Sequence, residues 1–174
     1  MNKTRIAAAS AAYIGVIVLA NWMTDTYGLV PIGFGLMVTA GTFAAGAALI
    51  ARDWLQIETN RWWVLAGIAA GVVLSVVLAN PAIAVASGVA FAVSELVDWG
   101  VFTPIRDMSL PLAVLVSSVV SAPVDTVLFL HIAGFGVTWE AVLGQFIVKT
   151  VMALIVAGAI VVVSDWREKQ SHLR

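Results

Sequence analysis

Long apolar stretches succeed one another along most of the chain. Each is close to the roughly 20 residues that a helix needs to cross the hydrocarbon of a bilayer. We see no alternation typical of strands, and an open sheet edge is costly in lipid because no water satisfies its backbone groups. The pattern therefore predicts one all-α domain over residues 1–174, a six-transmembrane-helix bundle. Its helices are expected at residues 6–22, 33–51, 62–79, 81–99, 108–131 and 139–164.

The composition agrees with an integral membrane protein. Of the 174 residues, 61% are hydrophobic and 11% are charged, and the mean hydropathy is +1.02. A soluble domain of this length has too little interior to cover that much apolar surface. The net charge of −1 gives no basic footprint for nucleic acid, and the lack of cysteine excludes disulfides and thiolate metal sites. The first apolar stretch resembles a signal peptide, but five more follow it, so we interpret it as the first transmembrane helix.

The lysines and arginines favour one orientation. With six spans, all but one of them fall on the same side of the membrane, and the opposite side has none. Because cytoplasmic loops carry an excess of these residues, both termini are expected in the cytoplasm. The exception is Lys149, which lies within the last predicted span. The eight residues on the shared side are Lys3, Arg5, Arg52, Arg61, Arg106, Arg167, Lys169 and Arg174.

For each of three sequence features, two interpretations remain open. The first outer connection, residues 23–32, is long and semi-apolar, so it either covers a pocket as a lid or rests at the interface. Trp22 either belongs to an aromatic belt at the headgroups or stacks on a flat ligand. Gly67 and Gly71 form a GxxxG motif, which indicates close helix contact within a monomer or between two copies.

Two carboxylates lie near the end of the fourth predicted helix. Glu95 and Asp98 are three residues apart and share a face. We expect Asp98 at a solvated helix end, where it pairs with Arg106. Glu95 is deeper, so it either bonds to a neighbouring helix or belongs to a transport path.

The fifth and sixth predicted helices carry further polar groups at membrane depth. Ser118, Ser121 and Asp125 follow a helical spacing, and Gln145 lies four residues before Lys149. Asp125 and Lys149 are expected to neutralise each other, either as a structural ion pair or in a polar ligand cavity. We find no motif for a catalytic residue, a metal ion or another cofactor.

Four segments resemble one family of membrane proteins. They are NWMTD at 21–25, SELVD at 94–98 with VFTPIR at 101–106, SSVVSAPVDTVLF at 117–129 with IAGFG at 132–136, and QFIVK at 145–149. The last three agree in order and spacing with segments of the VUT (vitamin uptake transporter) family, which is the queuosine precursor transporter family, and the first is similar to the first outer region of that family.

This resemblance implies an inner-membrane importer of 7-deazaguanine queuosine precursors, with no enzymatic activity. It also implies a fold like the substrate-binding subunits of energy-coupling-factor transporters. The expected partners are a small planar heterocycle and the lipid bilayer. A binding subunit of a multi-component transporter and a purely structural membrane subunit remain as alternatives. The predicted substrate-binding residues are Asn21, Trp22, Asp25, Glu95, Ser118, Ser121, Asp125, Gln145 and Lys149.

Overall fold

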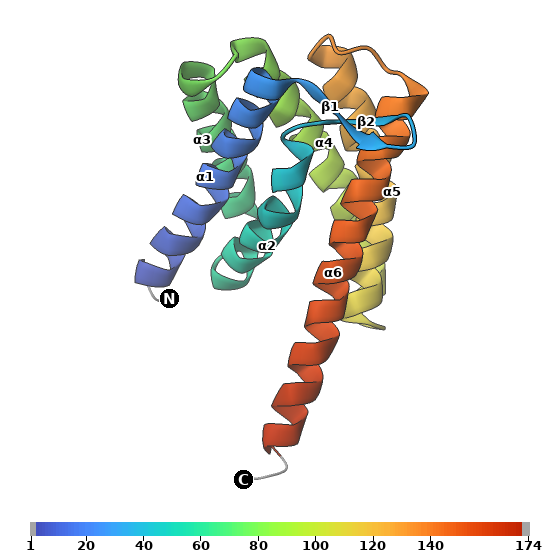
Figure 1. Cartoon of the computed structure of the whole chain (residues 1–174). Helices are drawn as coiled ribbons and strands as arrows, with labels where there is room; N and C mark the ends of the chain where they lie inside the picture. Colours follow the sequence, from blue (N-terminus) through green and yellow to red (C-terminus); the bar gives the residue numbers. More distant parts are fainter. Residues whose placement is uncertain (1–2, 172–174) are drawn as a thin grey trace.

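A computed structural model describes residues 3–171, apart from the side chains of residues 45, 46, 49, 50, 53, 57, 159, 160 and 163–171. Over this range the chain forms a helical bundle with one small hairpin (Figure 1). The elements in order are α1 (Lys3–Tyr27), β1 (Leu29–Gly33), β2 (Leu36–Thr39), α2 (Thr42–Glu58), α3 (Arg61–Leu78), α4 (Pro81–Ile105), α5 (Leu110–Ile132) and α6 (Trp139–Ser171).

A polar residue lies just before the first turn of each of α3, α4 and α5, and caps the start of that helix. Asn60, Asn80 and Ser109 each accept a hydrogen bond from a backbone N–H in the first turn of α3, α4 and α5. Such caps satisfy donors that have no partner inside the helix. The short connections therefore place successive helices side by side in opposite directions.

Five described helices are long and apolar enough to cross a membrane, which makes this a multi-pass membrane protein. They are α1, α3, α4, α5 and residues 139–158 of α6. Their positions agree with five of the six predicted spans. The remaining predicted span, a helix over residues 33–51, is wrong in its bounds. The helix there, α2, starts at Thr42 and has 17 residues.

Residues 29–39 form an antiparallel hairpin that the apolar pattern did not indicate. Leu29 pairs with Thr39 and Val30 with Val38. The turn at its tip consists of Gly33, Phe34 and Gly35, all with positive φ. This backbone conformation suits glycine and ends any helix. The sheet lies beside the first turns of α6, near the end of the bundle where α1 ends (Figure 1).

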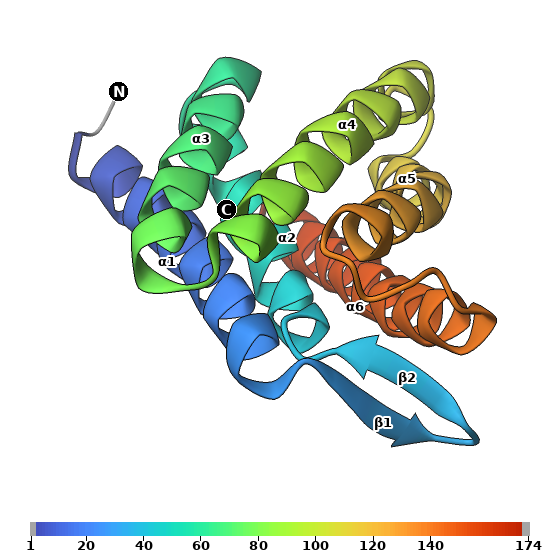
Figure 2. The same cartoon turned by 90° about the horizontal axis from the view of Figure 1, so that it is seen from above.

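The six helices form two halves of three (Figure 2). In the first half, α1 packs against α2 and α3 around an apolar cluster that includes Tyr13, Leu55 and Val64. In the second, α4, α5 and α6 enclose a cluster that includes Ala90 and Leu130. The halves meet mainly where α3 contacts α4, where α2 contacts α6, and where β2 lies on α6.

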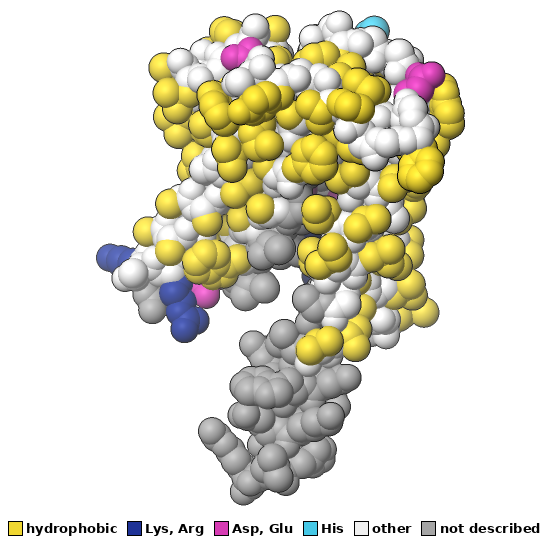
Figure 3. Space-filling view, viewed as in Figure 1, with side chains coloured by type: hydrophobic (Ala, Val, Ile, Leu, Met, Phe, Trp, Pro, Cys, Tyr) yellow, Lys and Arg dark blue, Asp and Glu magenta, His cyan; other side chains and the backbone are white. Residues whose placement is uncertain are grey.

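The two ends of the bundle differ in charge. The start of α1 and the end of α6 lie at one end, the terminal end, and the β-hairpin lies at the other, the hairpin end (Figure 1). Figure 3 shows lysine and arginine at the terminal end together with an acidic side chain, acidic and histidine side chains at the hairpin end, and hydrophobic side chains between them. This distribution matches the one-sided pattern of basic residues in the sequence.

The GxxxG motif of α3 contacts α1 inside the bundle. A Cβ atom at Gly67 would approach the ring of Tyr13 to 2.8 Å, and one at Gly71 would approach Ile17 Cγ2 to 2.7 Å. Both glycines are buried. They therefore permit close helix packing within one chain.

Candidate functional site

A cavity lies between the two halves, toward the hairpin end. It has a volume of about 90 Å³, is partly open to the outside, and is lined by residues from all six helices and from β2. Apolar side chains form most of its wall, among them Ile68, Val72 and Phe129. Concave apolar sites with a few converging polar groups are typical of small-molecule binding. The polar residues that line the cavity include Asn21, Thr39, Thr42, Asp125, Gln145 and Lys149.

Asp125 of α5 and Lys149 of α6 form an ion pair at the wall of the cavity. Lys149 Nζ contacts Asp125 Oδ2 and donates a hydrogen bond to Thr126 Oγ1 at 2.8 Å. The two side chains are 20% and 14% exposed. The expected neutralisation of Asp125 by Lys149 is confirmed. Because each carboxylate oxygen can accept two hydrogen bonds, this contact leaves acceptor capacity for another group.

Gln145 presents an unused donor. Its side chain is 2% exposed, and its Oε1 accepts a hydrogen bond from Thr42 Oγ1 at 3.3 Å. Thr42 is held in turn by Thr39, with 2.9 Å between the two hydroxyl oxygens. Gln145 Nε2 has no hydrogen-bond partner among the described residues. A buried donor without a partner costs about 1–3 kcal/mol, so a ligand acceptor at this position would recover that cost.

The residues predicted from the first outer region separate into two groups. Asn21 is buried, lines the cavity and donates from Nδ2 to Ser75 Oγ at 2.9 Å. Trp22 and Asp25 are exposed and do not line the cavity. The ring of Trp22 instead meets Tyr27 edge-on, with 6.1 Å between ring centres. Residues 23–27, which were expected in the first outer connection, instead belong to α1, which ends at Tyr27.

The serines of α5 bond within their own helix. Ser121 Oγ donates to the backbone oxygen of Ser118 at 3.4 Å, and neither residue lines the cavity. Pro123, which follows them, removes a backbone donor from the helix. Their predicted role in substrate binding stays a prediction.

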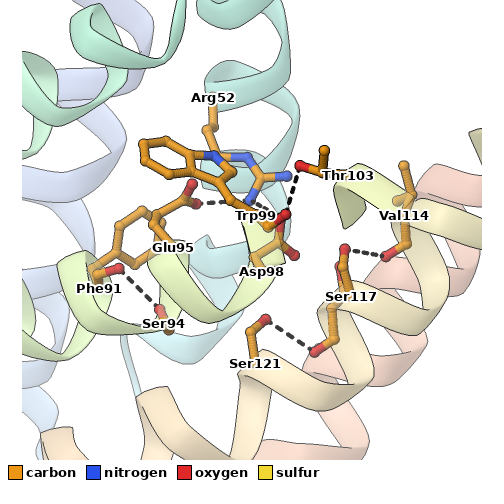
Figure 4. A network of polar contacts seen from close by, with 11 residues as sticks. Arg52, Phe91, Ser94, Glu95, Asp98, Trp99, Thr103, Val114, Ser117 and Ser121 are labelled. Carbon is orange, nitrogen blue, oxygen red and sulfur yellow. Dashed lines mark hydrogen bonds and ion pairs between the residues drawn. The ribbon is translucent and has the colours of Figure 1, made fainter. Parts of the chain in front are cut away.

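Glu95 and Asp98 lie outside the cavity and share a partner that sequence analysis missed (Figure 4). Arg52 Nη1 is 2.7 Å from Glu95 Oε1 and 3.7 Å from Asp98 Oδ2. All three residues are buried, with exposed fractions of 8%, 3% and 4% in the order Arg52, Glu95 and Asp98. We name these three residues the Arg52 cluster.

The expected pairing of Asp98 with Arg106 is wrong. Arg106 instead contacts its neighbour Asp107 at the surface, at 3.3 Å. The predicted helix over residues 33–51 placed Arg52 in a loop, whereas α2 continues to Glu58 and buries it. In the sequence, the two charged residues Arg52 and Asp53 stand side by side between apolar segments. This was the feature that could have indicated a polar contact within the bundle.

The lid was expected from residues 23–32, and the hairpin of residues 29–39 overlaps the second part of that segment. Thr39 of β2 lines the cavity, and the backbone of Met37 lies directly on α6 at Gly144. A Cβ atom at Gly144 would be 2.2 Å from Met37 O. Residues 29–39 are therefore held against α6 at the hairpin end of the cavity. Closure over a substrate remains a prediction.

A comparison with protein families decides the class of the protein. The model of the family described as "Putative vitamin uptake transporter" matches residues 7–163. The chain belongs to this family of transporters. Neither a curated protein nor a solved structure matches the chain. The match covers α1 from residue 7, the other four apolar spans, the hairpin, the cavity and the Arg52 cluster.

Proposed function

We propose that this family member imports 7-deazaguanine queuosine precursors, 7-cyano-7-deazaguanine or 7-aminomethyl-7-deazaguanine, across the inner membrane. The observation that carries the proposal is the buried, unused donor of Gln145 in the same cavity as the Asp125–Lys149 pair. The resemblance of segments 94–106, 117–136 and 145–149 to queuosine precursor transporters selects the substrate within this chemistry.

The edge of a deazaguanine base complements these groups. Its ring N–H and exocyclic amine form a donor edge next to a carbonyl acceptor. Asp125 can accept from both donors through its two oxygens. Gln145 Nε2 then donates to the carbonyl, and Lys149 keeps the carboxylate neutralised. In this arrangement every polar atom of that edge has a partner.

Access to the cavity requires movement of its walls. Its volume of about 90 Å³ is smaller than the roughly 300–1,000 Å³ of typical ligand pockets. The hairpin at one end and the junction between the two helical halves are the contacts whose change would widen it. We therefore propose transport by changes in these contacts around a site on α5 and α6.

Ligand-dependent thermal stabilisation of the purified protein tests the binding site. We expect the two deazaguanines to raise the unfolding temperature, and an analogue with an amine in place of the carbonyl to bind about 100-fold more weakly, because it opposes one donor with another. Asp125→Asn should lose binding, since an amide presents one donor and one acceptor. Asp107→Asn, an exposed aspartate at the terminal end, is the control and should bind like the parent.

Uptake distinguishes transport from the two alternatives. Cells that lack their own importer should accumulate labelled precursor when they express this protein alone. Binding without uptake would indicate a subunit that needs an energising partner. Equal binding by Asp125→Asn and the parent would contradict the proposed site.

A further inference from the structure

The Arg52 cluster lies directly beside the cavity, toward the terminal end. On α2, Arg52 follows the cavity-lining Ala48 by four residues, and on α4, Glu95 follows the cavity-lining Phe91 by four. Both helices run from the hairpin end to the terminal end (Figure 1). The cluster is therefore one helical turn, about 6 Å, nearer the terminal end than the cavity wall. A solute that leaves the cavity between α2 and α4 passes it.

The cluster joins two helices of different halves. Among the described residues, α2 and α4 are not one of the closely packed helix pairs. The long side chain of Arg52 crosses the space between them and reaches Glu95 and Asp98 on one face of α4 (Figure 4). At a similar level Tyr13 of α1 meets Phe91 of α4, with 6.4 Å between ring centres. Side-chain contacts rather than close backbone packing thus connect α4 to α1 and α2 on this side of the cavity.

An ion pair suits a contact that must open. A buried pair contributes little net stability compared with an apolar contact of the same size, because both ions lose water. When water enters, the attraction weakens and both ions regain hydration. Separation of an apolar contact would instead expose new apolar surface at the full cost of hydration. Glu95 and Asp98 also offer Arg52 two acceptors three residues apart on the same helix face.

We infer that the Arg52 cluster is the gate of the transport path at the terminal end, a role that rests on the proposed transport function. With Arg52 bound to Glu95, the two halves stay together and the cavity is separated from the terminal end. When this contact breaks, α2 and α4 move apart and the cavity opens there. Glu95 acts on access to the site rather than on the substrate.

Cysteine accessibility tests the gate without any substrate. The chain has no cysteine, so Ser87→Cys, at the cavity wall, reports alone. Membrane-impermeant maleimide is applied to vesicles that expose the terminal end, as shown by a cleavable C-terminal tag. We expect Arg52→Gln to raise the labelling rate at least about 10-fold, because it removes the cation from a buried pair.

The control is Arg5→Gln. Arg5 Nη1 is 3.5 Å from Glu58 Oε1, which is also an arginine–glutamate contact, but both helices belong to the same half and Arg5 is exposed. This variant should label Ser87→Cys at the parent rate. The charge-exchanged pair Arg52→Glu with Glu95→Arg should label more slowly than either single exchange, since opposite charges again face each other.

The outcomes separate the gate from a structural role and from the substrate. If Arg52→Gln labels at the parent rate while its unfolding temperature falls, the cluster only stabilises the bundle and the inference is wrong. If Arg52→Gln does not fold, Glu95→Gln removes the anion of the same pair and keeps its shape; labelling faster than the parent supports the gate, and labelling at the parent rate contradicts it. If labelling responds but the parent protein takes up no deazaguanine, the proposed substrate fails and the gate stands.

Discussion

At the scale of single residues, the cavity depends on polar groups whose hydrogen-bonding capacity the protein uses only in part. Gln145 is buried, yet its amide nitrogen has no hydrogen-bond partner among the described residues. Asp125 is held by Lys149 through one carboxylate oxygen. Folding alone does not favour such groups, because buried polar atoms that lack partners reduce stability. Their presence in one cavity is what a binding site requires.

Gln145→Leu should therefore change stability and binding in opposite directions. Leucine has a similar volume and removes the unpaired donor, so the free energy of unfolding should stay equal or rise by about 1 kcal/mol. Binding of 7-cyano-7-deazaguanine should fall about 10-fold or more, because the ligand carbonyl loses its donor. Unfolding in detergent and ligand-dependent thermal shifts measure the two effects. A variant with parent-like binding would exclude Gln145 from the site.

Lys149→Met should lower the free energy of unfolding more when it is made alone than when it is combined with Asp125→Asn. Removal of Lys149 leaves the carboxylate of Asp125 without its cation at membrane depth, which should lower the free energy of unfolding by about 3 kcal/mol. In the double variant no charge remains, so the loss should be clearly smaller. Chemical unfolding of the parent, both single variants and the double variant gives the coupling energy. Simply additive losses would mean that the two side chains do not interact.

At the scale of elements, the hairpin depends on one close contact with α6. Gly144 lets the backbone of Met37 lie on the helix, next to Gln145 in the sequence. Thr39, at the end of β2, contacts Thr42, which donates to Gln145. The position of the hairpin is thus linked to the orientation of the amide in the cavity. A displacement of β2 should reach the site through these two hydroxyl groups.

Gly144→Ala should displace the hairpin and weaken binding. The added Cβ atom would be 2.2 Å from Met37 O, so the strand or the helix must shift. We expect both a lower unfolding temperature and binding weaker by about 10-fold, the scale of one lost hydrogen bond in the site.

Gly158→Ala is the matched control for this prediction. It lies on the same helix, and a Cβ atom there would have nothing within 4 Å. Because alanine favours helix more than glycine by about 1 kcal/mol, this variant should be as stable as the parent or more so. Parent-like binding in both variants would show that the site does not depend on the contact between β2 and α6.

At the scale of the whole molecule, two three-helix halves enclose the cavity and the ends carry different charge. In the described part, Arg5, Arg61 and Arg106 lie at the terminal end, and Lys149 is inside the bundle. Asp25, His131 and Glu140 lie toward the hairpin end. Cytoplasmic loops are enriched in lysine and arginine, so the terminal end should face the cytoplasm. Substrate would then enter from the hairpin end and leave past the Arg52 cluster.

Sided labelling measures this orientation. Asp107→Cys, at an exposed position after α4, should react with an impermeant maleimide only when the cytoplasmic face is accessible. Thr138→Cys, just before α6 at the hairpin end, should react only from outside. Intact cells and inverted vesicles provide the two conditions. Labelling of Asp107→Cys in intact cells would reverse the orientation.

The sequence by itself determined five of the apolar spans and the polar residues within them. A span is a local property, because roughly 20 contiguous apolar residues suffice for it. The partner of Asp125 was also predictable: a carboxylate in lipid needs a cation, and Lys149 is the one lysine or arginine inside a predicted span. The site assignments for Glu95, Trp22, Asp25 and the serines remain predictions. None of these residues lines the cavity that Asp125, Gln145 and Lys149 share.

Only the tertiary structure decided the hairpin and the burial of Arg52. Residues 33–51 are as apolar as a span, but β2 pairs with β1 across a short turn and also packs on the face of α6 at Gly144, more than 100 residues away in the sequence. Once these residues form a hairpin, α2 starts later and carries Arg52 into the bundle opposite Glu95. The spacing of apolar residues does not show which other segment a residue will contact. Contacts between distant segments determine this, and here they place Arg52 next to the cavity.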